Sequence, residues 1–151
     1  MKNLISLLVF LLIYKLIIGQ SSDSLAVETT LEEIITIGNS IVTENESSSG
    51  VLFDRLAPYI LYSGNDAIRK HKDACDYNIT SDRNQVDIIG KKLVAWLETI
   101  IEFKVIKYGY QKKGNSEWHY ITVLGKTTKM EEKKVFIFVK VKDRFLIENI
   151  E

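Results

Sequence analysis

The sequence predicts an α+β fold in which three helices pack in the concave face of a curved antiparallel four-stranded meander sheet. The last third of the chain, from Phe103 to Glu151, contains four β-type runs joined by short polar turns, which is the pattern of a meander. The preceding part carries helical periodicity instead. Helices and strands that are segregated along a chain are typical of α+β folds.

The first 19 residues have the layout of a secretory signal peptide. A short positive region with Lys2 precedes an almost wholly apolar run from Leu4 to Ile18. Lys15 interrupts this run, whereas a stable membrane span needs about 20 apolar residues. We therefore expect cleavage before Gln20, export to the periplasm or the extracellular space, and no stable membrane span after cleavage. An uncleaved anchor is the alternative.

The composition indicates a single domain with a near-neutral charge. The chain has 20 basic and 20 acidic residues, and residues 20–151 retain 18 basic and 20 acidic ones, enough chain for a single domain. This near-neutral balance gives no electrostatic case for nucleic acid, which usually requires a strongly basic domain. A single cysteine, Cys75, excludes an internal disulfide and a cysteine-rich zinc site. Stability must therefore come from the core.

The first helix is expected over about four turns, from Val27 to Val42. Apolar residues recur there at helical spacing, and acidic residues near its start suit the positive end of the helix dipole. The run from Val51 to Tyr62 is apolar, but Pro58 disfavours a continuous helix beyond Ala57. It predicts a short helix or an irregular buried segment.

Two further helices are expected before the sheet. The second begins after a polar cap and runs from Asp66 to about Asp76, with Ile68 and Cys75 as its inward positions. The third follows the cap of residues 80–82 and runs to about Ile100, with an apolar face of helical period.

The third strand run, residues 134–142, is the most regular. Because successive side chains of a strand alternate between faces, Val135, Ile137, Val139 and Val141 line one face, which we expect to be fully buried. The opposite face begins with Phe136 and Phe138 and ends with lysines. A short turn at Asp143 joins it in a hairpin to the fourth run, residues 144–150.

The first two runs, residues 103–111 and 117–124, carry apolar side chains on both faces. In the first run the apolar phase shifts near Gly109, which predicts a β-bulge and a bend there. We therefore expect a strongly curved sheet that wraps the helices with one face and is partly covered on the other.

This pattern resembles the nuclear-transport-factor-2-like superfamily, whose members are α+β cones. The residues that carry the resemblance are the helical face from Leu31 to Val42, the strand pattern, and the closing hairpin from Val135 to Ile150. The segment from Leu56 to Asp73 also resembles exported bacterial members with no assigned activity. One departure is that residues 77–81 are too few for the strand pair that many members insert between the second and third helices. The resemblance implies a scaffold shared by isomerases, hydrolases, carriers and interaction modules, and fold alone does not choose among them.

Candidate catalytic groups are few. The histidines, His71 and His119, have no carboxylate or second ligand at useful spacing, so a structural role is expected for both. Asp73 and Asp76 flank Cys75 and would be neighbours on a helix, with Tyr59, Tyr62 and Tyr77 as nearby partners. Their charged surroundings favour solvation or pairing with Arg69 and Lys72 over the desolvation that an acid–base role needs.

The leading hypothesis is a non-enzymatic module that binds a protein or a small apolar ligand, with no cofactor, no metal and no catalytic residue assigned. It rests on the missing catalytic constellation and on an aromatic, lysine-rimmed sheet, of which Trp118, Phe136 and Phe138 are the interface candidates. A homodimer through that face is one form of the hypothesis. Whether the protein is an enzyme stays open, because the alternative is an isomerase or hydrolase that uses Asp73 or Asp76 inside the cone.

Overall fold

The computed structural model describes residues 22–62, 73–76 and 78–151 of the chain. The predicted signal peptide, His71 and most of the predicted helix from Asp66 lie outside these residues. Within them, α2 spans Ser22–Glu44, α3 spans Ser49–Leu56, and the 3₁₀ turn η1 spans Ala57–Tyr59. α4 covers Thr80–Leu97 and is followed by β1 (Glu102–Lys113), β2 (Ser116–Lys126), β3 (Glu131–Val141) and β4 (Arg144–Ile150).

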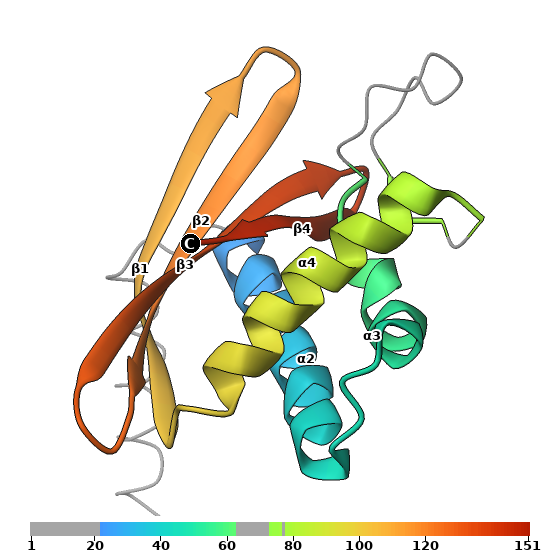
Figure 1. Cartoon of the computed structure of the whole chain (residues 1–151). Helices are drawn as coiled ribbons and strands as arrows, with labels where there is room; N and C mark the ends of the chain where they lie inside the picture. Colours follow the sequence, from blue (N-terminus) through green and yellow to red (C-terminus); the bar gives the residue numbers. More distant parts are fainter. Residues whose placement is uncertain (1–21, 63–72, 77) are drawn as a thin grey trace, which may run out of the picture.

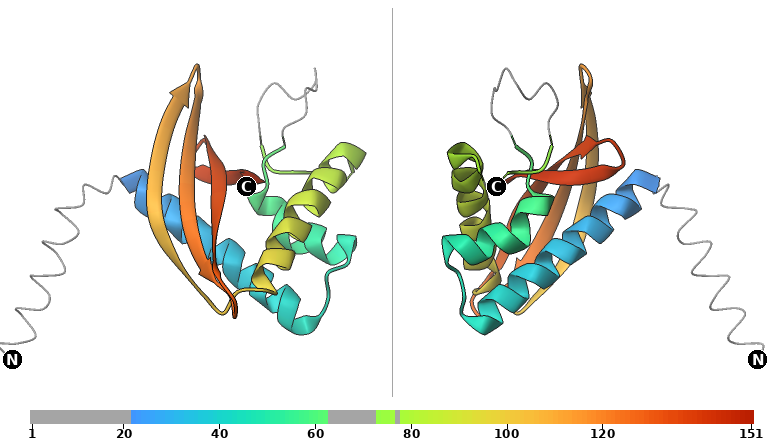
Figure 2. Two further views of the ribbon diagram at one scale, coloured as in Figure 1. Left: turned by 60° about the vertical axis from the view of Figure 1, so that its left-hand side comes forward. Right: turned by 90° about the vertical axis from the view of Figure 1, so that its right-hand side faces the viewer.

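The four strands form one antiparallel sheet in the order β1-β2-β3-β4, which confirms the predicted meander. The helices lie against one face of this strongly curved sheet (Figures 1 and 2). The predicted α+β arrangement of three helices and four strands is therefore correct. No described helix is long and apolar enough to cross a membrane.

The helices differ from expectation in detail. α2 is longer than predicted, and α3 ends before Pro58 as the proline requires. Residues 73–76, expected to close a helix, are extended: Ala74 forms an antiparallel bridge with Leu61, and the Cys75 N–H donates to the Ile60 carbonyl at 3.1 Å. This backbone pairing replaces the helical hydrogen bonds that the capping pattern suggested, so this part of the prediction is wrong.

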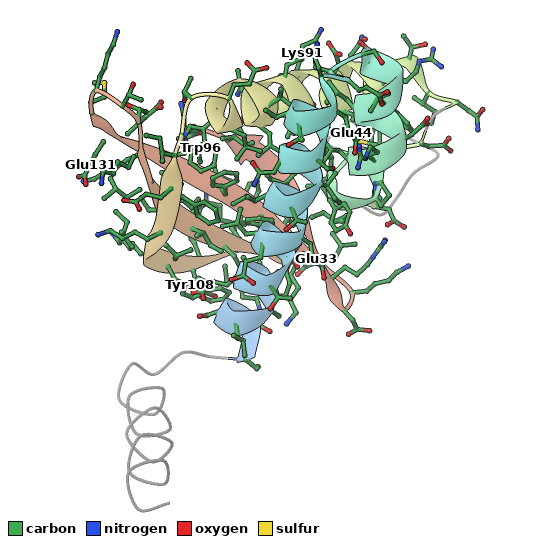
Figure 3. All side chains as sticks on the ribbon, turned by 90° about the horizontal axis from the view of Figure 1, so that it is seen from below. Glu33, Glu44, Lys91, Trp96, Tyr108 and Glu131 are labelled. Carbon is green, nitrogen blue, oxygen red and sulfur yellow. The ribbon has the colours of Figure 1, made fainter. Side chains whose placement is uncertain are left out.

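The face of β3 that meets the helices is the one with Phe136 and Phe138, both of which have 0% of their surface exposed. Trp96 of α4 meets the Phe136 ring edge-on, with the ring centroids 5.5 Å apart. Side chains fill the layer between the helices and the sheet. Trp96 extends into this layer from α4, and Tyr108 extends into it from β1 (Figure 3). The opposite face, with Val135, Ile137, Val139 and Val141, was expected to be fully buried, which is wrong at both ends of the strand, because Val135 and Val141 are half-buried.

A smaller apolar cluster covers the other face of the sheet, as predicted. Leu61, Val139 and Leu146 are buried there, with Trp118 and Ala74 packed against them. The main and smaller clusters together explain why both faces of β3 are apolar. Ile137 and Val139 of this face are both buried, so the middle of β3 is buried on both sides.

The predicted bulge exists but lies at Ile106, where the β1–β2 register shifts between Val105 and Lys107. The bulge keeps Val105 and Tyr108 on the same face, opposite Val123 and Ile121. Gly109 instead pairs regularly with Tyr120. The shift in the apolar pattern of β1 thus predicted the bulge, whereas Gly109 did not mark its position.

The buried and exposed phenylalanines of the helix-facing side give a direct test of this packing. Phe136→Ala should lower the free energy of unfolding by about 3–5 kcal/mol, because it removes a fully buried ring and leaves a cavity. Phe103→Ala, at a position 38% exposed in β1, should cost about 1 kcal/mol or less. Urea denaturation followed by circular dichroism measures both, and equal losses in the two variants would contradict the assigned core.

Candidate functional site

Two regions of the described chain offer functional chemistry. One is a polar cluster around His119 at the margin of the core, where α2 begins. The other is the hairpin of β1 and β2, in which four large apolar side chains of β1 remain exposed. The residues that the sequence singled out fall mostly elsewhere.

Of the three predicted interface residues, only Trp118 lies on the outer face of the sheet. Phe136 and Phe138 are fully buried against the helices and present no surface to a partner, so their assignment as interface residues is wrong. The physical reason is the choice of face: the helices cover the side of β3 that carries both rings. Trp118 is half-buried, and the Lys113 ammonium lies 5.3 Å from the centre of its ring.

Asp73 and Asp76 do not enter the cone. The Asp73 carboxylate pairs with the Arg144 guanidinium at 2.7 Å, at a position where both side chains are about half exposed. Asp76 is exposed, and its carboxylate accepts the Asn78 N–H at 2.9 Å. Neither carboxylate is buried, as an acid–base role inside the cone would require. The structure therefore does not place these two carboxylates inside the cone, where the isomerase or hydrolase mechanism would need them.

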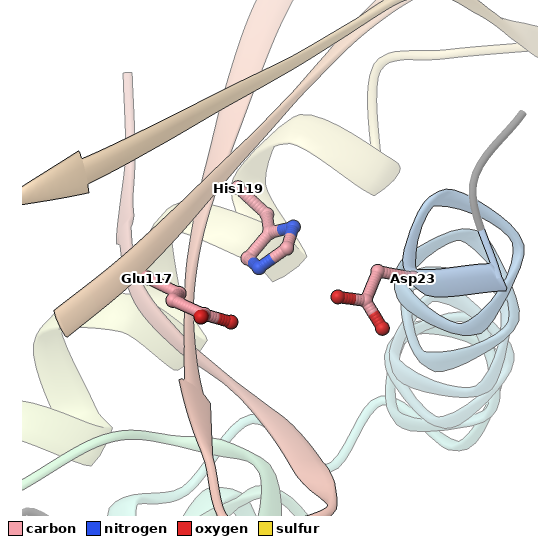
Figure 4. A group of neighbouring side chains, drawn as sticks. All are labelled: Asp23, Glu117 and His119. Carbon is pink, nitrogen blue, oxygen red and sulfur yellow. The ribbon is translucent and has the colours of Figure 1, made fainter.

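The histidine site joins residues of all four strands and of α2. His119 is fully buried on β2, and its Nδ1 lies 2.8 Å from the Tyr108 hydroxyl on β1. Phe145 of β4 meets the imidazole edge-on, with the ring centroids 4.9 Å apart. Strand alternation places Glu117 on the same face as His119, and the first turn of α2 brings Asp23 to them (Figure 4).

Lys140 supplies the positive charge of this cluster. Its ammonium group donates to both carboxylate oxygens of Asp23, at 2.8 and 2.9 Å, and lies 3.9 Å from the Glu117 carboxylate. The hydrogen bond to Asp23 raises the pKa of Lys140 above its ordinary value. One lysine thus partly neutralises two carboxylates beside a buried imidazole.

Sequence reasoning missed this cluster. The sequence did carry a partial signal, because Glu117 and His119 are two residues apart in a strand and must share a face. The third member, Asp23, comes from a helix that begins nearly a hundred residues earlier, so spacing could not have revealed it. The sequence prediction that His119 has no carboxylate partner is therefore wrong, because the structure places two carboxylates beside it.

The β1–β2 hairpin is the second region. Large apolar side chains of β1 remain exposed there, and β1 contacts chiefly β2 (Figure 1). Two open grooves lie on the hairpin. One of about 450 Å³ lies over Gly109, between Tyr110 and Tyr120, and one of about 230 Å³ lies beside Phe103 and Leu124. This surface is apolar in its middle and carries lysines along its length.

No protein-family model and no curated protein sequence matches the chain. A search of solved structures finds a designed nuclear-transport-factor-2-like protein, with 14% sequence identity and a TM-score of 0.39. The match covers 82% of this chain and 96% of the designed one. At this level the similarity defines neither the family of the chain nor its activity.

Burial of His119 predicts a pH dependence of stability. Burial is the main cause that lowers the pKa of His119 below its ordinary 6.5, against the opposing charges of Asp23 and Glu117. The folded protein therefore holds this imidazole neutral where the unfolded chain already binds a proton. Its contribution to stability is fully present above about pH 6.5 and is lost as the pH falls from there toward the lowered value.

His119→Gln should flatten this part of the stability curve. Urea unfolding between pH 7.5 and 5 measures the free energy of unfolding for both proteins. The natural chain should lose more stability than the variant over this interval, and parallel curves would show that His119 is not held neutral by the fold.

Proposed function

We propose that this chain is a non-enzymatic protein-binding domain of the nuclear-transport-factor-2-like class, and that it binds its partner along β1. The arrangement of helices on the concave face of a four-stranded meander supports the class. The main support for this binding surface is the exposure of β1, because all twelve of its residues are exposed or half-buried. Four of them are large and apolar, namely Phe103, Val105, Ile106 and Tyr110.

The two edges of the sheet differ. The β4 edge is partly covered, because the Leu61 N–H donates to the Ile147 carbonyl at 2.8 Å and Ile60 forms a parallel bridge with Ile147. β1 has a strand neighbour on one side only among the described residues. An uncovered edge strand presents backbone N–H and C=O groups that an extended segment of another protein can pair with.

Charge indicates which segment would pair there. β1 carries four lysines and one glutamate, so two copies of β1 side by side would bring like charges together. Lysines on an edge strand also oppose indiscriminate pairing. These charges favour an extended partner segment in which acidic residues alternate with apolar ones, and they disfavour a second copy of this chain.

The proposal includes export of the protein from the cytoplasm. Residues 1–19 have the composition of a signal peptide, which supports a partner in the periplasm or outside the cell. The grooves beside Gly109 and Phe103 support the binding of apolar side chains of that partner. The smaller cluster with Trp118 lies on the outer face of the sheet, opposite to the side that carries Phe103 and Val105.

A display library of twelve-residue peptides, selected on the purified protein, tests the proposed surface. Selected peptides should alternate apolar and acidic residues, and each should bind the natural chain with micromolar affinity when measured by fluorescence anisotropy. Ile106→Glu should weaken this binding by about tenfold or more, because it places an acid at the centre of the exposed strand.

Ile88→Glu is the matched control. It makes the same substitution at an exposed isoleucine of α4, outside the sheet, and should leave peptide affinity unchanged. Equal affinities for the natural chain and Ile106→Glu would contradict the β1 surface. A dimer in sedimentation experiments that Ile106→Glu dissociates would instead assign the surface to a second copy.

A further inference from the structure

Three groups of the histidine cluster have the chemistry of metal ligands. One ligand atom each from Asp23, Glu117 and His119 lies within 4.8 Å of the other two. Two of them stand on one face of β2, and Asp23 reaches them from the first turn of α2 (Figure 4). A carboxylate pair alone would be an ordinary surface feature, since acidic groups often cluster without a ligand.

The second observation is the imidazole itself. His119 has no exposed surface, and no group in the described part of the chain hydrogen-bonds its Nε2. A buried polar atom without a partner costs about 1–3 kcal/mol, so such atoms are uncommon in folded proteins. In Figure 4 one ring nitrogen turns toward the space between the two carboxylates. Because Nδ1 is held by the Tyr108 hydroxyl, the nitrogen directed there is Nε2.

We propose that Asp23, Glu117 and His119 bind a divalent transition-metal ion of the Zn²⁺ type. Imidazole nitrogen with carboxylate oxygens is a common donor set for Zn²⁺ and its neighbours, whereas Mg²⁺ and Ca²⁺ prefer oxygen donors throughout. The hydrogen bond between Tyr108 and Nδ1 is the outer contact that such a histidine needs. With Nδ1–H donating to the tyrosine oxygen, the Nε2 lone pair is free to bind the ion.

The geometry requires a small closure. An ion bonded at about 2.0–2.2 Å to each ligand atom holds those atoms roughly 3.4 Å apart, so the side chains must approach by about an ångström. Asp23 and Glu117 each have about a third of their side-chain surface exposed. They can therefore turn toward the ion, and their exposed side provides its entry path.

The Lys140 ammonium group would compete with a metal ion for the two carboxylates. Its ammonium group lies at the same two carboxylates, at 2.8 Å from Asp23 and 3.9 Å from Glu117. A divalent ion would replace this single charge, and the partly exposed lysine would turn to solvent. An ion-pair network alone accounts for Lys140, Asp23 and Glu117, but it leaves Nε2 of His119 without a partner.

Titration of the purified chain with Co²⁺ and Zn²⁺ tests the site. Co²⁺ should bind at one site with a visible absorption band, and Zn²⁺ should displace it. His119→Gln, Asp23→Asn and Glu117→Gln should each weaken binding by about tenfold or more. Tyr108→Phe should weaken it by about tenfold, because the outer hydrogen bond is lost.

Lys140→Met tests the site through a gain of binding, which a poorly folded variant would not show. It removes the competing ammonium and should strengthen Zn²⁺ binding by about tenfold. His71→Gln, which changes the other histidine of the chain, should leave binding unchanged. Absence of binding to the natural chain, or weaker binding by Lys140→Met, would overturn the site, as would equal affinities in His119→Gln and the natural chain.

Discussion

The packing of Phe136 and Phe138 against the helices decides where the other features of this molecule lie. Trp96 of α4 meets Phe136, and α2 crosses the same face of the sheet toward β2 and β4 (Figure 2). The space inside the curve is thereby filled with apolar side chains. Because the described interior is packed, the large apolar side chains that the described strands expose all lie on β1.

The histidine cluster lies where this apolar layer ends. His119 pairs with Phe138 across the strands and shares its face, so the imidazole belongs to the core. Two residues further toward the strand end, Glu117 already meets solvent and the charges of Lys140 and Asp23. A polar group at such a boundary combines low local dielectric with access, which strengthens the interactions of a bound ion or proton. The start of α2 is held on the sheet by the Asp23–Lys140 ion pair at the same place.

Much of the architecture follows from local pattern. The period of α2, the stop at Pro58 and the alternation of β3 and β4 were sufficient to predict three helices and a meander. Pattern could not decide which face of β3 meets the helices, because Phe136 and Phe138 compete with Ile137 and Val139 on an equally apolar opposite face. That choice depends on Leu61 and Ala74, which cover the second face from a distant part of the chain. The site around His119 escaped prediction for a similar reason, since Asp23 reaches β2 only through the packing of α2.

The central claim is that β1 is an open edge beside a sheet whose middle strands, β2 and β3, are paired with a neighbouring strand on both sides. Amide hydrogen exchange measured by NMR on the purified chain tests it strand by strand. Amides of β2 and β3 should exchange slowly, at rates set by global unfolding, while the β1 amides that point away from β2 should exchange quickly. Protection of those β1 amides equal to that of β3 in a monomeric sample would show that the edge is covered, and would contradict the account.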